Sequence, residues 1–427
     1  MESPKIPFDP ATAQAPASWK GLSILLGLVG AGLAAGAWFT KSSETRFAHA
    51  YLVGFMLVAL IGTGALMFVM LQQLSRAGWS VSSRRIAEGW ISSLFLLVLL
   101  FIPLVLLAKG GHLYAWMDGF GAAAVKNAGN IPDADRLAAH VHHMSEKKAF
   151  WLNESSWLAR SAFYLVAWVI LAALILRRSF ATDGANKEDA AKHTTFIGTL
   201  SAPGVPLLGL TLTFACFDWV MSLQFDWYST IFGVIHFADS MVLIASLMII
   251  SIAVFQGKGL MKGAVNVEHK HDLAKWLFAF NTFFAFVSYA QFIIIWFADI
   301  PEETVWYHRH ADDGWGLLGW ITLFGHFFVI FFLLMSRHMK RNQFVTVLVS
   351  VFAVLMAIVH LFWEIMPTMG YPVPHAAGAF SVQAADILVI VGLLTMSVAA
   401  FLFTLSGRNL VSVGDPRLQE SLKFENY

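Results

Sequence analysis

Ten apolar stretches divide this 427-residue chain, and each is long enough to cross a lipid bilayer. A membrane-spanning helix needs about 20 apolar residues, because it rises about 1.5 Å per residue through a hydrocarbon core about 30 Å thick. Hydrophobic residues make up 58% of the chain and charged residues only 13%, which excludes an ordinary soluble domain. We therefore predict an all-α integral membrane protein with ten transmembrane helices, near residues 21–39, 50–71, 90–108, 156–176, 204–222, 230–255, 274–299, 315–335, 344–366 and 383–405.

The charges of the loops predict how these helices are oriented. Ten helices put both termini on one side of the membrane. Of the 28 Lys and Arg residues, Arg160 and Lys275 fall inside predicted helices, and the other 26 divide into 18 on the side of the termini and 8 on the opposite side. Because positively charged loops stay in the cytoplasm, we expect both termini there. Residues 1–20 are interpreted as a flexible cytoplasmic tail, 21–405 as one membrane domain and 406–427 as a second cytoplasmic tail.

The composition also excludes several cofactor sites and partners. Cys216 is the single cysteine, so the chain cannot form an internal disulfide, a CxxC site, a CxxCH haem attachment or a four-cysteine iron-sulfur site. A net charge of +1 gives no basic field that would attract nucleic acid. The sequence HVHH at residues 140–143 lies in a predicted charged loop and is interpreted as solvated, so we predict no metal site in this chain.

Ionisable residues inside the predicted helices are the strongest functional signal, because charge is costly to bury in hydrocarbon. In the predicted orientation all of them except Lys275 lie in the outer half of the membrane or near its midplane. We interpret them as candidates for a proton pathway: Asp218, His236, Asp239, Asp299, His326, His360, Glu364, Asp386 and Arg160. An ordinary interfacial position is an equal alternative for Asp299, Glu364 and Asp386, which lie near predicted helix ends.

Two pairs among these residues have helical spacing. His236 and Asp239 are three residues apart, and His360 and Glu364 are four apart, so each pair shares one helix face and can form an imidazole-carboxylate couple. Such a couple can pass a proton, because histidine titrates near neutral pH. A buried, hydrogen-bonded structural role is the alternative. The inner half of the helices offers only neutral polar groups such as Asn281.

The outer loop at residues 298–315 predicts a short surface helix. Pro301 suits the first helical position, and Glu302 and Glu303 complement the positive end of the helix dipole. The helix is either a solvated interfacial segment or a docking surface or proton exit that uses Glu302, Glu303 and His308.

Three motifs resemble a known family. DWVMSLQFDWYSTIFG at residues 218–233 and SYAQFIIIWFADIPEETVWY at 288–307 resemble the ActF-type membrane subunit of alternative complex III, which belongs with the NrfD and polysulfide-reductase membrane subunits. KKAFWLNESSWLAR at 147–160 is similar to the segment that leads into that family's fourth helix and ends at Arg160. The resemblance covers about residues 50–405.

The resemblance implies a fold, an activity and a set of partners. The fold has two four-helix bundles, formed by predicted helices 2–5 and 6–9, with a flanking helix at each end. The activity is that of a quinol:cytochrome c, or other high-potential acceptor, oxidoreductase complex of the bacterial inner membrane. In such a complex this chain contributes a proton pathway. Whether it also binds quinone or quinol is left open. The implied partners are a homologous ActC-type membrane subunit, an iron-sulfur subunit, multihaem and monohaem c-type cytochrome subunits, small membrane-anchored subunits and a terminal oxidase. Haem c and iron-sulfur clusters would lie on those partners and not on this chain.

Two other functions stay open. Ten helices with charges at the midplane also suit a proton-coupled secondary transporter, but Pro103 and the pair Pro203 and Pro206 do not mark broken helices at matching positions of two halves. A purely structural anchor for extrinsic cytochromes would leave Asp239 and His326 without a task.

Overall fold

The computed structural model describes residues 7–117, 125 and 134–425. Within these ranges ten helical segments are long and apolar enough to cross a membrane, so the predicted all-α membrane fold and its ten spans are confirmed. The spans are α1 (Trp19–Thr40), α2 (Glu44–Leu74), α3 with α4 (Val81–Trp90 and Ser93–Lys109), α7 (Glu154–Ala181), α8 (Lys187–Trp219), α9 (Phe232–Gly257), α10 (Val267–Ala298), α12 with the π-helix η7 and α13 (Gly316–Ile321, Thr322–Val329 and Ile330–Met335), α15 (Gln343–Ile365) and α16 (Ala384–Leu405).

Shorter helices connect the spans or cover their ends. The α-helices among them are α6 (Ala134–Lys148), α11 (Pro301–Ala311), α14 (Arg337–Arg341) and α17 (Leu418–Leu422). The 3₁₀ turns are η1 (Pro10–Ala13), η2 (Gly78–Ser80), η4 (Thr182–Gly184), η5 (Met221–Gln224), η6 (Asp312–Gly314) and η8 (Met366–Thr368).

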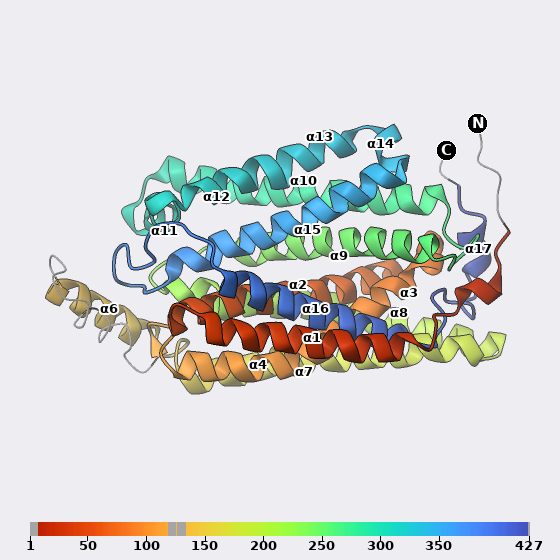
Figure 1. Cartoon of the computed structure of the whole chain (residues 1–427), viewed down its shortest axis with the longest axis horizontal. Coiled ribbons are helices and arrows are strands. Elements are labelled where there is room, and N and C mark those ends of the chain that lie inside the picture. Colours follow the sequence, from red (N-terminus) through yellow and green to blue (C-terminus); the bar gives the residue numbers. More distant parts are fainter. Residues whose placement is uncertain (1–6, 118–124, 126–133, 426–427) are drawn as a thin grey trace.

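The spans form two bundles that meet along α2 and α9. The first bundle contains α2, α4, α7 and α8, and the second contains α9, α10, α12 to α13 and α15 (Figure 1). This agrees with the grouping that the resemblance implies. The two flanking helices, α1 and α16, pack against each other, and a Cβ on Gly30 would lie 2.6 Å from the Gly392 carbonyl oxygen. Glycine at both positions therefore allows these helices to approach closely.

Both chain ends lie at one end of the molecule, here called the terminal end; the opposite end is called the distal end (Figure 1). Part of the predicted flexible tail is packed at the terminal end. The backbone N–H of Ala15 donates to the Arg408 carbonyl at 2.9 Å, and that of Leu410 donates to the Ala13 carbonyl at 2.6 Å. The segment that follows α16 therefore holds the start of the chain in place. Residues 1–6 lie outside the described residues.

Side-chain caps determine where several helices begin. Helix α8 begins at Lys187 and not near residue 204, because Asn186 caps it by accepting a hydrogen bond from the Asp189 backbone N–H. Pro203 and Pro206 lie inside this helix, so the predicted start near residue 204 was wrong. Membrane helices tolerate internal proline where neighbouring groups satisfy the freed carbonyls.

Candidate functional site

Five ionisable side chains meet where α9, α15 and the π-helix η7 pack in the second bundle. Helix α9 supplies His236 and Asp239, α15 supplies His360 and Glu364, and η7 supplies His326. All five side chains are buried. The sequence predicted each of them separately, and the structure brings them together. We call these five residues the proton cluster.

The carboxylates link the histidines of different helices. Asp239 Oδ1 lies 2.9 Å from His326 Nε2, and Asp239 Oδ2 lies 2.6 Å from His360 Nδ1. Glu364 Oε1 lies 3.4 Å from His360 Nε2, and Glu364 Oε2 lies 3.1 Å from His236 Nε2. The predicted contact between His360 and Glu364 is thus confirmed. The predicted couple of His236 with Asp239 is wrong, because Asp239 turns toward α15 and η7 and His236 turns toward Glu364.

A count of protons indicates what the proton cluster can do. Three histidines have six ring nitrogens, and each nitrogen faces an oxygen. Four of these oxygens belong to the two carboxylates; the others are the Phe232 carbonyl, 3.0 Å from His236 Nδ1, and Asn281 Oδ1, 3.2 Å from His326 Nδ1. Three neutral imidazoles and two ionised carboxylates share three protons and carry two negative charges. Burial favours an uncharged cluster, which holds two more protons. The uncharged cluster then has five protons for its six nitrogen–oxygen contacts.

One contact of the uncharged cluster is therefore without a proton. The two contacts of Glu364 are the longest between carboxylate and imidazole in the cluster, at 3.1 Å to His236 and 3.4 Å to His360. A proton that enters at one end can move by rearrangement from contact to contact, so the geometry suits conduction along the chain of side chains.

Neutral polar groups extend from the cluster region toward the distal end. The Ser229 hydroxyl donates to Gln291 Oε1 at 2.7 Å, and Gln291 Nε2 donates to the Tyr307 hydroxyl at 3.3 Å. Burial raises the pKa of Tyr307 to about 12, and the Glu364 carboxylate also raises it. Ser229 is partly exposed, so these hydrogen bonds connect Tyr307 with the distal surface.

His310 packs against the proton cluster from the distal helix α11. Its Nδ1 lies 2.7 Å from the Trp306 carbonyl oxygen, and its Nε2 lies 3.0 Å from the Glu364 carbonyl oxygen. Burial lowers the pKa of His310 to about 4, which keeps the ring neutral at neutral pH. The ring therefore has one N–H to donate to these two carbonyls.

We expect His310 to make folding stability depend on pH. Its pKa is about 4 in the folded protein and 6.5 when unperturbed, so the unfolded chain binds the proton first and stability falls as the pH drops through this interval. The shift corresponds to about 3 kcal/mol. Denaturant unfolding of the purified chain across this interval should lose this slope in His310→Gln and keep it in the exposed control His308→Gln. Equal slopes in the two variants would contradict the prediction.

Asp218 and Arg160 form a second polar site, at the distal end of the first bundle. Arg160 Nε and Nη2 each donate to one carboxylate oxygen at 2.8 Å. The Tyr164 hydroxyl and Trp151 Nε1 add donors at 2.8 and 3.0 Å. Asp218 is fully buried, and all four donors come from α7 or the turn before it. The site therefore has the form of a structural ion pair, separate from the proton cluster.

A pocket of about 310 Å³ opens beside this ion pair. Its walls are mainly aromatic and include Trp151, Phe217, Phe225 and Trp227. Lys148 also lines the pocket and donates to the Phe225 carbonyl. An apolar pocket with few polar groups suits a ring-shaped organic ligand.

Asp386 and Asp299 lie away from the proton cluster. Asp386 is buried in an ion pair with Arg46, with 2.6 Å between its Oδ2 and Arg46 Nη2, and it accepts from the Gln383 backbone N–H at the start of α16. The sequence did not predict Arg46 as its partner, because the two residues lie on helices far apart in the chain. Asp299 is exposed and ends α10 with a left-handed φ of 48°. The interfacial alternative therefore describes Asp299, and a structural ion pair describes Asp386.

The predicted surface helix at the distal end is confirmed as α11. Glu302 and His308 are exposed, and Glu303 is partly buried. The backbone carbonyl of Glu303 accepts a hydrogen bond from Trp227 Nε1 at 3.0 Å, which ties α11 to the turn before α9. None of the three side chains joins the proton cluster, so a docking or exit role for them stays a prediction.

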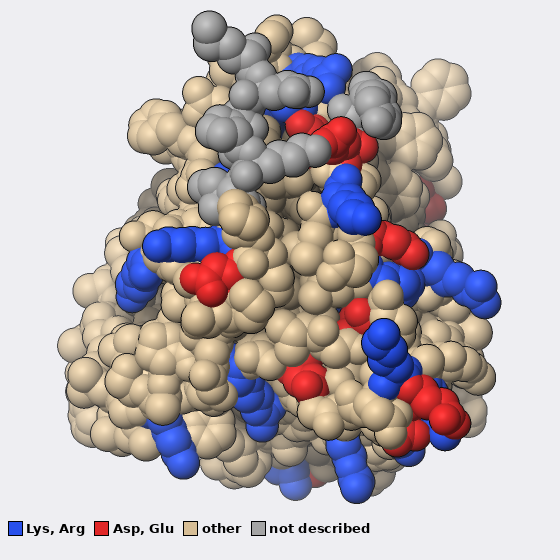
Figure 2. All heavy atoms as spheres, turned by 90° about the vertical axis from the view of Figure 1, so that its right-hand side faces the viewer, with Lys and Arg blue, Asp and Glu red and all other residues tan. Residues whose placement is uncertain are grey.

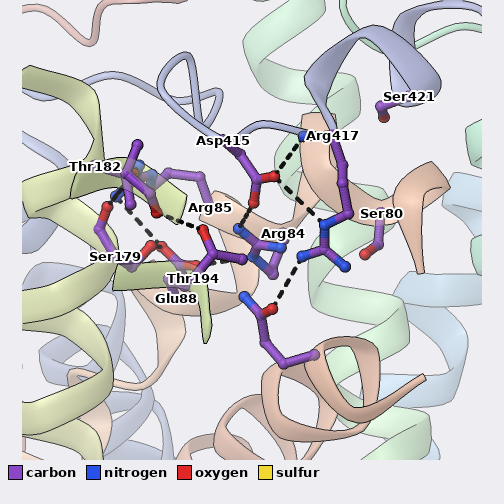
Figure 3. A network of polar contacts seen from close by, with 12 residues as sticks. Ser80, Arg84, Arg85, Glu88, Ser179, Thr182, Thr194, Asp415, Arg417 and Ser421 are labelled. Carbon is purple, nitrogen blue, oxygen red and sulfur yellow. Dashed lines mark hydrogen bonds and ion pairs between the residues drawn. The ribbon is translucent and has the colours of Figure 1, made fainter. Parts of the chain in front are cut away.

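A buried ionic network at the terminal end was missed by the sequence analysis (Figure 3). Arg84 Nη2 lies 2.8 Å from Asp415 Oδ2, and Arg85 Nη2 lies 2.8 Å from Asp183 Oδ1. Glu88 lies between the two arginines, 3.2 Å from Arg84 Nε and 3.4 Å from Arg85 Nη1. These arginines were counted as loop charges, although their spacing to Glu88 on one helix was a signal for ion pairs. The network ties the segment after α16 to the bundle.

The histidines of the HVHH sequence lie on α6 and not in a loop. The side chains of His140, His142 and His143 are exposed, and His142 Nδ1 lies 3.6 Å from Glu146 Oε2. Within residues 7–117, 125 and 134–425, no group of three or more His, Cys, Asp or Glu side chains is arranged to hold a metal ion.

Comparison with known proteins adds no assignment to this geometry. No protein-family model matches the chain, and no curated protein matches it.

Proposed function

We propose that this chain is a membrane subunit of a quinol:cytochrome c, or other high-potential acceptor, oxidoreductase complex in the bacterial inner membrane. Its task in that complex is to conduct protons from the membrane midplane to the outer surface. The observation that carries the proposal is the proton cluster, in which five buried ionisable side chains from three helical segments are in continuous contact. The kind of complex is proposed from the resemblance of residues 218–233 and 288–307 to the ActF-type subunit.

Quinol oxidation fits the chemistry of such a chain. Each quinol that becomes a quinone gives up two electrons and two protons. The electrons pass to haem c and iron-sulfur centres of partner subunits, because one buried cysteine gives this chain no such centre. The protons need acceptors within the membrane, and the carboxylates and imidazoles of the proton cluster are acceptors of this kind.

The charge distribution supports the orientation in this proposal. Figure 2 looks onto the terminal end and has basic side chains spread across that face. Exposed residues there include Lys20, Arg177 and Lys187. The positive-inside rule assigns such an end to the cytoplasm, so the distal end with Ser229 and Tyr307 would face the outside.

Affinity capture of the chain from gently solubilised native membranes tests the proposal. The captured material should contain an ActC-type subunit, iron-sulfur and c-type cytochrome subunits and a c-haem spectrum, and it should reduce an acceptor cytochrome with quinol. A colourless chain that purifies alone would overturn the proposal and favour a transporter. A haem-containing assembly in which all proton-cluster variants keep normal proton release would favour a structural anchor.

A further inference from the structure

Asn281 of α10 contacts the innermost member of the proton cluster. Its Oδ1 lies 3.2 Å from His326 Nδ1, and its Nδ2 donates to the Phe327 carbonyl at 3.4 Å. Asn281 is fully buried. Both partners belong to the π-helix η7, so one amide group bridges a histidine and the backbone beside it.

The Phe327 carbonyl determines which way the Asn281 amide points. A carbonyl oxygen only accepts hydrogen bonds, so it must face the NH₂ group of the amide. The amide oxygen then faces His326 Nδ1, and that nitrogen must carry a proton to make a hydrogen bond. Segments of π-helix recur at functional sites, and here the wider turn presents a side chain and a carbonyl to the same amide.

We infer that Asn281 is a positioning residue that holds a proton on Nδ1 of His326 and ends the proton pathway at the membrane midplane. The consequence of this inference for proton transfer rests on the proposed function. With Nδ1 occupied, exchange of protons by His326 takes place at Nε2, which faces Asp239 at 2.9 Å. The amide of Asn281 does not ionise and so does not accept the proton onward.

The side on which the pathway is closed follows from this arrangement. In the described part of the chain, the side chain of Asn281 hydrogen-bonds to no ionisable group other than His326. Among the described residues, the ionisable contacts of His326 continue only through Asp239 toward His360 and Glu364. The pathway is therefore closed at Asn281, and it continues from His326 toward the distal end.

Nitrogen NMR of the intact captured assembly, grown with ¹⁵N-labelled histidine, tests the inference. The His326 signal is identified by its loss in His326→Gln. This signal should show that Nδ1 of His326 is protonated in the native protein. The Nδ1 proton should be lost in Asn281→Leu. It should remain in Asn281→Asp, because aspartate retains an acceptor oxygen. Ser288→Ala, on the same helix, is the control and should leave the signal unchanged.

Two results would overturn the inference. One is a native His326 that carries its proton only on Nε2, which needs no Asn281 variant to observe. The other is an Asn281→Leu signal identical to that of the native protein. In the same samples, quinol-dependent proton release should fall about tenfold in Asn281→Leu and recover in Asn281→Asp. If Asp239→Asn leaves proton release intact, the proposed function fails, whereas the NMR result still decides the role of Asn281.

Discussion

Asp239→Asn should lower quinol-dependent proton release by the purified assembly about tenfold or more, because Asp239 joins the two halves of the proton cluster. Its carboxylate contacts His326 and His360 at 2.9 and 2.6 Å, and an asparagine at this position can neither ionise nor exchange a proton with both rings. The measurement is the yield and rate of proton release by proteoliposomes that contain the assembly, with quinol as donor and a cytochrome as acceptor.

Asp299→Asn is the matched control for this experiment. The sequence also makes Asp299 a candidate, with an interfacial position as the equal alternative, but Asp299 is exposed at the distal end and has no place in the cluster. Asparagine tolerates the left-handed φ of 48° at this position, so the variant should keep both its fold and its proton yield. Partner subunits that co-purify with Asp239→Asn would show that it assembles. Full proton release by an assembled Asp239→Asn variant would remove the proton cluster from the pathway.

The fold was largely predictable because the bilayer imposes one length and one composition on every span. Ten apolar stretches became ten spans, and the errors concern helix ends. Helix α10 begins at Val267 and not near residue 274, because Asn266 and His269 form a capping box there. The first turns of α8 and α10 are polar, so their hydropathy does not mark them as part of a span. A hydropathy pattern indicates burial in lipid and does not detect hydrogen-bonded helix caps.

The members of the proton cluster were predictable, but their pairing was not. Spacing along one helix places His236 near Asp239, whereas the structure pairs His236 with Glu364 of α15 and Asp239 with His326 of η7. Contacts between helices depend on how each helix is rotated about its axis and on the depth of its residues in the membrane. The spacing of residues along one helix determines neither. The same reason explains why Asp386 was predicted as a proton carrier and is instead the partner of Arg46.

Arg160→Met should destabilise the folded chain by about 3 to 5 kcal/mol, because it leaves the buried carboxylate of Asp218 without its cation. Asp218 is fully buried and accepts two hydrogen bonds of 2.8 Å from this guanidinium, so the variant removes two of the donors of a buried carboxylate. Unfolding of the purified chain in mixed detergent micelles measures the change. Arg177→Met, an exposed position on the same helix, should change stability by no more than about 0.5 kcal/mol.

A second variant separates a structural role of this ion pair from a role in proton transfer. Adding Asp218→Asn to Arg160→Met removes the unpaired charge, so the double variant should recover part of the lost stability. Both variants, assayed at a temperature where they remain folded, should release as many protons per quinol as the native assembly. A lower proton yield in a fully folded double variant would instead make Asp218 part of the pathway, and it would require a link between the two bundles where α2 and α8 pack against α9.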